Sequence, residues 1–532
     1  MIQHAPKYKP LLFTTTMRNP KRLKGILNVF KHFDGEQLTN ELAASIMGEL
    51  IRYGLYRPTK GITKNIEQKW GSKRITDTSQ IGIELLSNKD VAHLLEKNPQ
   101  KHKEAGFEEG WPSRFATVFD LAKELGFVYY KQGENIEFSE IGNLLADSIE
   151  ITTEDSLIGL NDVHPEFEQH AFLNALVKYQ RKNPFVRVLN DNVPLILLLE
   201  VIQKLKGDPD LSDAGISKLE LPFVAFWKDN DSDALYQFIK TFRERHGLNP
   251  SLEAIVDACV DDIMAGDYKK FKPSSLTSDY VDEFIRKMRL TGIFSLRGAG
   301  RFLDINQKEI NKVRYILATY SDYSEYTDER EYFKYVSTID DNLVSVVPTT
   351  SEEQNVYLEK WVNTFSWDEI RNEMMTLAQK QMSKNDILKY IAAPVRLEFL
   401  TSIAIKSKFP DIRVVPNYPV DDEGLPTSTA AGTNNTGDIE CYENLDGILI
   451  EVTMSEGRTQ TMMEVWPISR HLAEFRNKTE NSMCYFVAPS IFSDSAKQIK
   501  YVKQTENLFI SPKTIEEFLK HLENNSVLYS AV

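Results

Sequence analysis

Cysteine is scarce in this sequence. Only three cysteines occur in 532 residues, Cys259, Cys441 and Cys484, and they lie far apart. Their spacing fits neither a zinc motif nor a disulfide framework, so we expect buried, small apolar side chains in a reducing compartment. Long apolar runs are also missing: no segment approaches the ~20 continuous apolar residues of a membrane span, and residues 1–6 lack the apolar core of a signal peptide. The sequence therefore predicts a multidomain cytoplasmic protein with no membrane partner.

Positive charge is in the minority overall but not everywhere. The chain has 63 Lys and Arg against 77 Asp and Glu, a net charge of −14. Residues 1–75 nonetheless contain fourteen basic and five acidic residues, a balance of +9, whereas residues 322–373 contain four and thirteen, a balance of −9. Basic side chains displace counterions from nucleic acid, so the N-terminal segment is a candidate phosphate-contacting surface. A solvated charged surface explains the same composition equally well.

The order helix, strand, tight turn, strand occurs twice in the first 320 residues. The first copy covers residues 112–146 and the second residues 279–306, with a glycine in each turn. This order is typical of a winged helix, which either binds DNA or serves as a protein-interaction module. Two copies, the second rich in arginine, favour DNA binding.

These patterns predict a multidomain α+β fold, with a mostly helical N-terminal half that carries two winged-helix-like units and a C-terminal α/β core. We predict DNA-recognition domains over residues 1–160 and 161–320, an acidic linker region over 321–384 and the α/β domain over 385–532. The candidate DNA contacts are basic residues at helix ends, in turns and in the N-terminal segment: Arg18, Lys21, Arg22, Arg57, Arg114, Arg286, Arg289 and Arg297.

The C-terminal segment alternates between helix and strand. We predict a helix over 395–409, strands over 413–415, 438–442 and 448–453, a helix over 462–476 with Pro467 at its start or at a kink, and a strand over 482–487. Residues 444–447 form a turn, so the second and third strands should pair as a hairpin.

Two carboxylates mark this hairpin. Asp438 opens its first strand, and Glu451 lies near the end of the second, so both side chains can meet on one face. Neighbouring carboxylates repel each other unless a cation joins them, and hard oxygen ligands suit Mg²⁺, which activates water for attack on a phosphodiester. Glu398 in the preceding helix and Glu464 after the hairpin could add ligands, and His471 could carry a proton or contact phosphate.

Each of these side chains also has a purely structural interpretation. Glu398, Glu464 and His471 fit exposed helix positions, and Asp438 fits a turn or a cap. Glu451 is more informative, because a Glu within Ile-Leu-Ile-Glu-Val needs a partner or a metal if its strand is buried. On a solvated face it would need neither.

At these residues the chain resembles the PD-(D/E)xK nuclease superfamily. More closely, it resembles the AlwI family of Type IIS restriction endonucleases and the related large subunits of nicking endonucleases. The resemblance lies in residues 14–20 (Thr-Thr-Thr-Met-Arg-Asn-Pro), 430–432, 438–440, 450–453 and 464–471, and it is tightest between residues 397 and 471. It implies an N-terminal half that reads a short asymmetric DNA site and a Mg²⁺-dependent C-terminal domain that cuts a few base pairs outside it.

The family's acidic residues carry over to Glu398, Asp438, Glu451 and Glu464, of which the last three are the expected metal ligands; His471 completes the expected catalytic set. One position departs from the superfamily: Thr453 stands where a Lys normally positions or activates the water. The close relatives resemble this chain in lacking that Lys, and the carboxylate of Glu464 would compensate.

Other functions fit the same sequence. A winged-helix DNA-binding regulator could use the α/β domain for interaction alone, and a nuclease could act without reading a site. One catalytic centre cuts one strand, so cleavage of both strands of double-stranded DNA would need a homodimer or a small second-strand-cleaving subunit. The sequence leaves nicking and double-strand cutting open.

Overall fold

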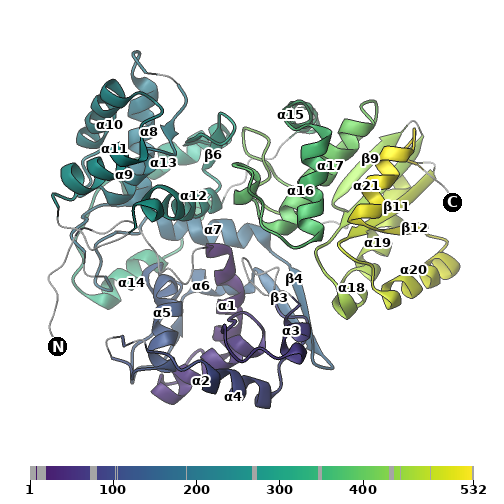
Figure 1. The fold of residues 1–532 in the computed structure, drawn as a ribbon, viewed down its shortest axis with the longest axis horizontal. Helices are drawn as coiled ribbons and strands as arrows, with labels where there is room; N and C mark the ends of the chain where they lie inside the picture. Colours follow the sequence, from purple (N-terminus) through teal and green to yellow (C-terminus); the bar gives the residue numbers. More distant parts are fainter. Residues whose placement is uncertain are drawn as a thin grey trace. The chain divides into compact units, whose positions relative to one another are not determined.

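The computed structural model describes residues 8, 19–71, 81–101, 103–104, 106–186, 188–211, 213–266, 272–344, 350–430, 436–443, 445–479 and 481–529 (Figure 1). Contacts within the chain divide it into two compact units. Unit 1 comprises Met1–Met47, Pro99–Ala146 and Glu166–Val347, and unit 2 comprises Gly48–Asn98, Asp147–Pro165 and Pro348–Val532. The predicted division into DNA-reading, linking and cutting domains concerns function and stays a prediction.

Unit 1 is mostly helical. Its helices are α1 (Leu23–Phe30), the first part of α2 (Asn40–Arg52), α5 (Trp111–Glu124), α6 (Glu140–Asp147), α7 (Pro165–Leu176), α8 (Pro194–Gly207), α9 (Leu221–Phe226), α10 (Ser232–His246), α11 (Leu252–Asp257), α12 (Tyr280–Leu290), α13 (Ile310–Tyr320) and α14 (Glu329–Ser337). A ring cluster joins α1 to α5, because Phe30 packs on Phe115 and Phe119 with ring centroids 5.3 and 4.3 Å away. Buried aromatic pairs of this kind contribute roughly 0.5–1.5 kcal/mol beyond their area.

Both predicted repeats of helix, strand, turn and strand are present in unit 1. In the first, β1 (Val128–Tyr129) pairs antiparallel with β2 (Glu137–Phe138) after α5. In the second, β6 (Phe294–Arg297) pairs with β7 (Phe302–Ile305) after α12, and a third strand, β5 (Ile216–Ser217), adds to β7. The order of elements is confirmed, whereas the name winged helix and a role in DNA binding stay predictions.

A glycine fixes the end of the first repeat's helix. Gly126 has φ +74°, and a Cβ there would lie 2.9 Å from the backbone nitrogen of Ser337. The left-handed conformation and the close approach both require glycine, so α5 ends where the sequence predicts.

Unit 2 is built around a five-stranded sheet in the order β12-β11-β10-β9-β8. The strands β8 (Arg413–Pro416), β9 (Ile439–Glu443) and β10 (Asp446–Val452) are antiparallel neighbours, and β11 (Asn481–Ala488) and β12 (Ile510–Thr514) continue in parallel from β10. The predicted strands and their hairpin are therefore confirmed, with β12 as an addition.

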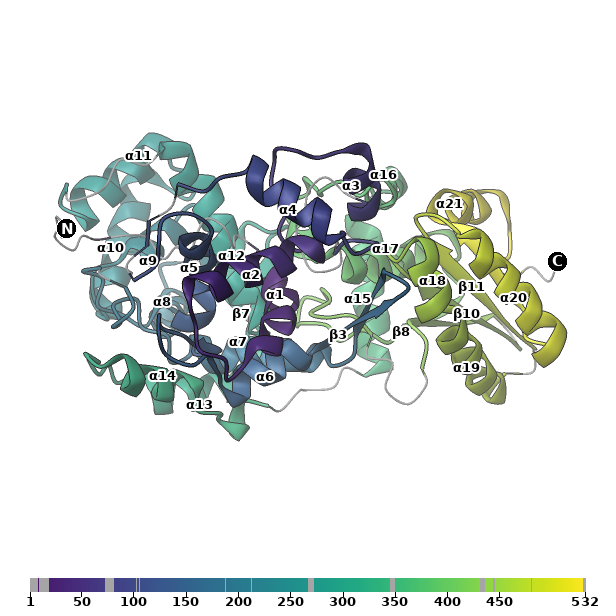
Figure 2. The same ribbon diagram turned by 90° about the horizontal axis from the view of Figure 1, so that it is seen from below.

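Helices cover both faces of this sheet (Figure 2). Leu449 and Phe486 pack with residues of α19 (Val465–Phe475) and α20 (Ser493–Glu506) in one apolar cluster. On the other face Tyr485 contacts Phe518 of α21 (Ile515–Asn524), and α17 (Ala393–Lys408) lies against β8 and β10. Burial on both faces explains why β10 is an almost continuous apolar run.

The predicted acidic linker contains α14 and two further helices, α15 (Ser351–Thr364) and α16 (Trp367–Ala378). Both α15 and α16 pack against α17 within unit 2. Capping boxes begin both helices, at Thr350 with Glu353 and at Ser366 with Glu369, so part of the acidic charge serves to satisfy helix N-termini. The linker assignment itself stays a prediction.

The remaining elements of unit 2 are the end of α2, α3 (Lys64–Trp70), α4 (Asn88–Lys97), α18 (Gly457–Met463) and an antiparallel hairpin of β3 (Ile149–Glu154) and β4 (Leu157–Asp162). All three cysteines are buried and unpaired, as predicted. Among the described residues, none of the helices combines the length and the apolar character that crossing a membrane requires.

Candidate active site

Asp438 and Glu451 lie at the same end of the β9–β10 hairpin. The strands pair from Asp446 with Glu443 to Ile450 with Ile439, and the next step of an antiparallel ladder places Glu451 opposite Asp438. The Val452 N–H donates a hydrogen bond to Asp438 Oδ2 at 2.8 Å. Asp438 and Glu451 are therefore neighbours, as the hairpin predicted. The hydrogen bond between the Asp438 side chain and the backbone also fits the alternative interpretation of Asp438 as a turn or cap residue.

Glu451 points toward α19. Its side chain is buried, at 6% exposure, and its Oε1 lies 2.8 Å from Nδ1 of His471. The sequence favoured an exposed helix position for His471, and that interpretation is wrong, because only 14% of its side chain is exposed. Pro467 lies in the first turn of α19, where it removes no helical hydrogen bond, and α19 is a separate helix from α18.

Glu398 reaches the site from α17. The interpretation as an exposed helix acid is wrong, since Glu398 is 4% exposed. Its Oε2 accepts a hydrogen bond from the Ala430 N–H at 2.9 Å. The cause is that α17 is covered by the sheet on one side and by α15 and α16 on the other, so no side of the helix was free for a solvated acid.

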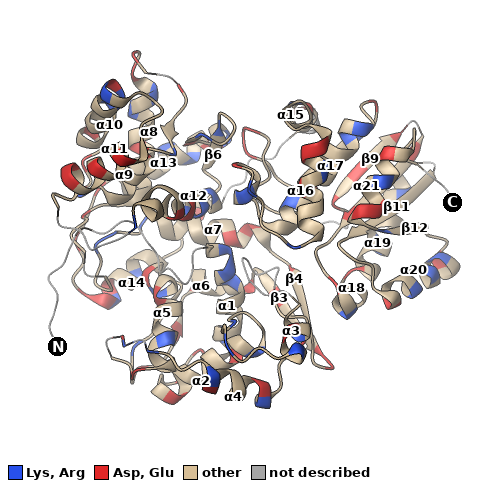
Figure 3. Cartoon of the chain, viewed as in Figure 1, with Lys and Arg blue, Asp and Glu red and all other residues tan. Residues whose placement is uncertain are grey.

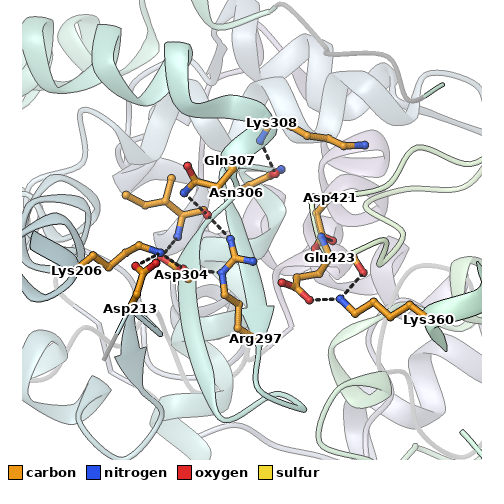
Figure 4. A network of polar contacts seen from close by, with 11 residues as sticks. Lys206, Asp213, Arg297, Asp304, Asn306, Gln307, Lys308, Lys360, Asp421 and Glu423 are labelled. Carbon is orange, nitrogen blue, oxygen red and sulfur yellow. Dashed lines mark hydrogen bonds and ion pairs between the residues drawn. The ribbon is translucent and has the colours of Figure 1, made fainter. Parts of the chain in front are cut away.

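The loop that leads to Ala430 is fixed by α15 (Figure 4). Trp361 donates from Nε1 to the carbonyl of Glu423 at 3.0 Å, and Lys360 forms an ion pair with the carboxylate of Glu423. Asp421 is fully buried and accepts the N–H groups of Glu423 and Leu425 at 3.0 and 2.9 Å. Sequence reasoning assigned no role to these residues.

Glu464 occupies the junction between α18 and α19. The Thr453 hydroxyl donates to Glu464 Oε1 at 2.6 Å, and the Ser455 N–H donates to the Thr453 Oγ1 at 3.0 Å. The interpretation as an exposed helix acid is wrong here too, because Glu464 is partly buried and lies between two helices. Thr453, which departs from the superfamily pattern, thus orients the acid that was expected to compensate for the missing Lys.

Burial and mutual repulsion act together on these carboxylates. Burial raises the pKa of Glu398, Asp438, Glu451 and Glu464 above their ordinary values. The charge of Glu451 raises the pKa of Asp438 further, and that of Asp438 does the same to Glu398. Burial lowers the pKa of His471, which favours a neutral imidazole. The group therefore binds protons, or a cation, more readily than isolated acids do.

The donor chemistry fits a hard divalent cation. Asp438 and Glu451 lie at one end of the β9–β10 hairpin, and the charge of Glu464 raises the pKa of both. Carboxylate oxygens are the ligands that Mg²⁺ takes in proteins. In the part of the chain that the structure describes, no three acidic, histidine or cysteine side chains converge in a ready-made metal cluster, so the fit rests on ligand type and on charge repulsion.

We expect Glu451→Gln to stabilise the metal-free protein at pH 8. Because burial raises the pKa of Glu451 in the folded state, the stability that this carboxyl contributes is present below its unfolded pKa of ~4.3 and is lost as the pH rises through the folded value. Gln removes that loss. Thermal unfolding in EDTA should show a gain of about 2–4 °C at pH 8, equivalent to about 1 kcal/mol, and a smaller gain at pH 5. A gain that does not grow with pH would contradict this assignment.

The basic residues predicted to contact DNA form ion pairs, hydrogen bonds or ring contacts with other residues of the protein. Lys21 Nζ lies 3.5 Å from Glu168 Oε2 in unit 1, and Arg289 Nη1 donates to the Phe294 carbonyl at 3.4 Å. In unit 2, Arg57 donates to the Gly54 carbonyl at 2.8 Å and stacks over Trp70. Figure 3 shows basic and acidic residues interspersed on most helices.

Arg297 has a structural partner (Figure 4). Its Nε donates to Asp304 Oδ2 at 2.5 Å, and Lys206 Nζ lies 2.6 Å from the same oxygen. The Asp304 side chain is fully buried, so this ion-paired group holds the turn between β6 and β7. Arg22, Arg114 and Arg286 are half-buried and also have contacts within the chain. Arg18 and residues 14–17 lie outside the described residues, and DNA contact by any of the candidates stays a prediction.

Comparison with known protein families and solved structures gives evidence that is independent of the site geometry. A family model described as AlwI restriction endonuclease matches residues 123–391 and 341–521, most of the chain. No curated protein sequence matches. Among solved structures, the small subunit of the heterodimeric restriction endonuclease R.BspD6I is 26% identical, covers 29% of this chain and 76% of its own, and has a TM-score of 0.25. Restriction endonuclease FokI is 10% identical, covers 98% of this chain and 96% of its own, and has a TM-score of 0.24.

Proposed function

The chain belongs to the AlwI restriction endonuclease family and is a Type II restriction endonuclease, and we propose that it acts in the Type IIS manner. In this proposal residues 1–320 read a short asymmetric site in double-stranded DNA. Residues 385–532 hydrolyse a phosphodiester a few base pairs outside that site. The observation that carries the proposal is that four acids, from α17, the start of β9, β10 and the α18–α19 junction, influence one another's pKa.

Asp438, Glu451 and Glu464 would hold Mg²⁺, which when bound polarises the phosphodiester and lowers the pKa of a water molecule. Each acid is positioned by a neighbour: the Val452 N–H orients Asp438, and the Thr453 hydroxyl orients Glu464. Glu398, held by the Ala430 N–H, adds negative charge beside Asp438 and strengthens the demand for a cation.

His471 would position Glu451 and move a proton. Its Nδ1 is hydrogen-bonded to Glu451 Oε1, and in such pairs the carboxylate sets which ring nitrogen carries the proton. The lowered pKa of His471 favours the neutral ring, so with the proton on Nδ1 the other nitrogen would accept a proton from the attacking water. We assign the metal-binding and catalytic roles on this chemistry.

The number of cuts depends on a second catalytic centre. One group of acids hydrolyses one strand, so this chain alone would nick. Cleavage of both strands would take a homodimer or a small second-strand-cleaving subunit. Both modes are part of the proposal and have different products.

Incubation of supercoiled plasmid and bacteriophage DNA with the protein and Mg²⁺ or Mn²⁺, followed by run-off sequencing of both strands, tests the proposal. We expect breaks at a fixed offset from one asymmetric sequence. Breaks in one strand would indicate nicking, and breaks in both would indicate a second centre. Cleavage at scattered positions would contradict site reading. Binding to duplex DNA without any break would favour a regulator with a non-catalytic α/β domain and would overturn the proposal.

A further inference from the structure

The β3–β4 hairpin belongs to a different unit from its neighbours in the chain. It lies between α6 and α7, and the segments on either side, Pro99–Ala146 and Glu166–Val347, are part of unit 1. The hairpin itself packs within unit 2, together with the sheet that carries the acids. A short segment that packs in a different unit from its flanking segments needs specific contacts, because these must offset the conformational entropy lost when the segment is ordered.

The hairpin is tightly built and anchored at its tip. Asp155 and Ser156 have φ of 48° and 70°, the signature of a two-residue turn that matches the twist of paired strands. The Ser156 carbonyl accepts a hydrogen bond from the Leu85 N–H at 2.7 Å, and the Ile158 N–H donates to the Ile83 carbonyl at 2.9 Å. Left-handed non-glycine residues persist only where the surroundings hold them, so this hairpin is a fixed support.

One face of the hairpin packs on α18. The Thr459 hydroxyl donates to the Ile158 carbonyl at 2.6 Å in a buried contact. A Cβ at Gly159 would lie 2.5 Å from the Thr152 hydroxyl of β3 and 3.3 Å from Met463 Sδ of α18. The absence of a side chain at Gly159 therefore gives room first to Thr152 in the paired strand and also to the last turn of α18.

The helix that the hairpin supports ends at a candidate metal ligand. Glu464 follows α18 directly, and its carboxylate must be held within about 0.5 Å to coordinate productively. The contact between the hairpin and α18 therefore connects the hairpin to the site.

We propose that the β3–β4 hairpin is a positioning element for the active site, and that Thr459 is its main positioning residue. Its bond to Ile158 holds α18, and thereby Glu464, in the arrangement that cleavage requires. The inference rests on the proposed function, because it assigns Glu464 to the cleavage site. It adds a role for residues 149–162, which are remote in sequence from the acids.

Thr459→Val tests the proposal because it keeps the side-chain shape and removes the hydroxyl donor. Thr461→Val is a matched control on the same helix, since the Thr461 hydroxyl bonds to Ser495 Oγ at 2.8 Å instead. Loss of one buried hydrogen bond at a positioning residue should lower the cleavage rate constant about tenfold. We expect this loss in Thr459→Val with an unchanged DNA dissociation constant and a higher Mg²⁺ requirement, near-normal rates in Thr461→Val, and recovery in Thr459→Ser.

Equal rates for Thr459→Val and the wild type, or equal losses in both valine variants, would overturn the proposal. A wild-type protein that cuts no DNA would instead overturn the proposed function. Amide hydrogen exchange over residues 457–464 then tests whether the hairpin holds α18. Faster exchange in Thr459→Val than in Thr461→Val supports that role, and unchanged exchange overturns it.

Discussion

Asp438→Asn is expected to abolish DNA cleavage, with a rate loss on the order of 10³-fold or more, while DNA binding stays intact. The charges of Glu451 and Glu464 raise the pKa of Asp438, and the charge of Asp438 in turn raises that of Glu398. Removing one carboxylate charge from a metal-assisted site removes both a ligand and transition-state stabilisation. The amide oxygen of Asn can still accept the bond from the Val452 N–H, which Asp438 now accepts at 2.8 Å, so the hairpin should fold normally.

The measurement is single-turnover cleavage of a plasmid under saturating Mg²⁺, with DNA binding measured separately in Ca²⁺. Asp446→Asn is the matched control. Asp446 lies at the opposite end of β10 and accepts a hydrogen bond from Asn481 Nδ2 at 2.9 Å. The control should cut within about twofold of the wild-type rate, as expected for a surface substitution away from the site. Asp438→Asn cutting at a comparable rate would rule out the active-site assignment.

The proximity of Asp438 and Glu451 could be predicted because it is a local property. A short turn between two apolar strands fixes the register, and the alternation of side chains then places both acids on neighbouring positions. The structure has this register. The same strand left two environments open for Glu451, a solvated face or a buried position with a partner; the structure has the second, with His471 as the partner.

The burial of Glu398 and Glu464 could not be predicted in this way. A single acid in a helix carries no signal about which elements pack around it. Glu398 is buried because α15 and α16, from the segment predicted as a linker, cover α17. Glu464 is oriented by Thr453 across a break between two helices. Both depend on contacts between segments that are distant in sequence.

The sequence also did not predict the β3–β4 hairpin or the strand β12 of unit 2, because both depend on their place in the folded unit. The hairpin of β3 and β4 reaches α18 across 301 residues of sequence, through the bond from Thr459 to Ile158. The strand β12 contains Pro512, which argues against a central strand but is tolerated at the edge of a sheet. The observed order places β12 at that edge. Strand propensity alone could decide neither case.

Gly437 offers a way to disturb the site without altering any carboxylate. It directly precedes Asp438, and its carbonyl accepts a hydrogen bond from Asn417 Nδ2 at 2.6 Å. A Cβ at this position would overlap Glu451 Oε1 and lie 2.6 Å from Leu449 Cδ1. Contacts this short force a neighbour to move, and the end of the Glu451 side chain is the group most able to do so.

Gly437→Ala is therefore expected to lower the cleavage rate about 10²-fold, since a displacement of about 1 Å in a catalytic group has effects of that size. Gly447→Ala is the control, because its Cβ would lie 2.5 Å from Thr479 Oγ1 and 2.7 Å from Phe475 Cε1, at the other end of β10. Overpacking should lower the free energy of unfolding by about 1–3 kcal/mol in both variants. Only Gly437→Ala should lose single-turnover cleavage at a temperature where both are folded. Equal losses would mean that the sheet's stability limits cleavage. A selective loss would show that the position of Glu451 matters as well as its charge.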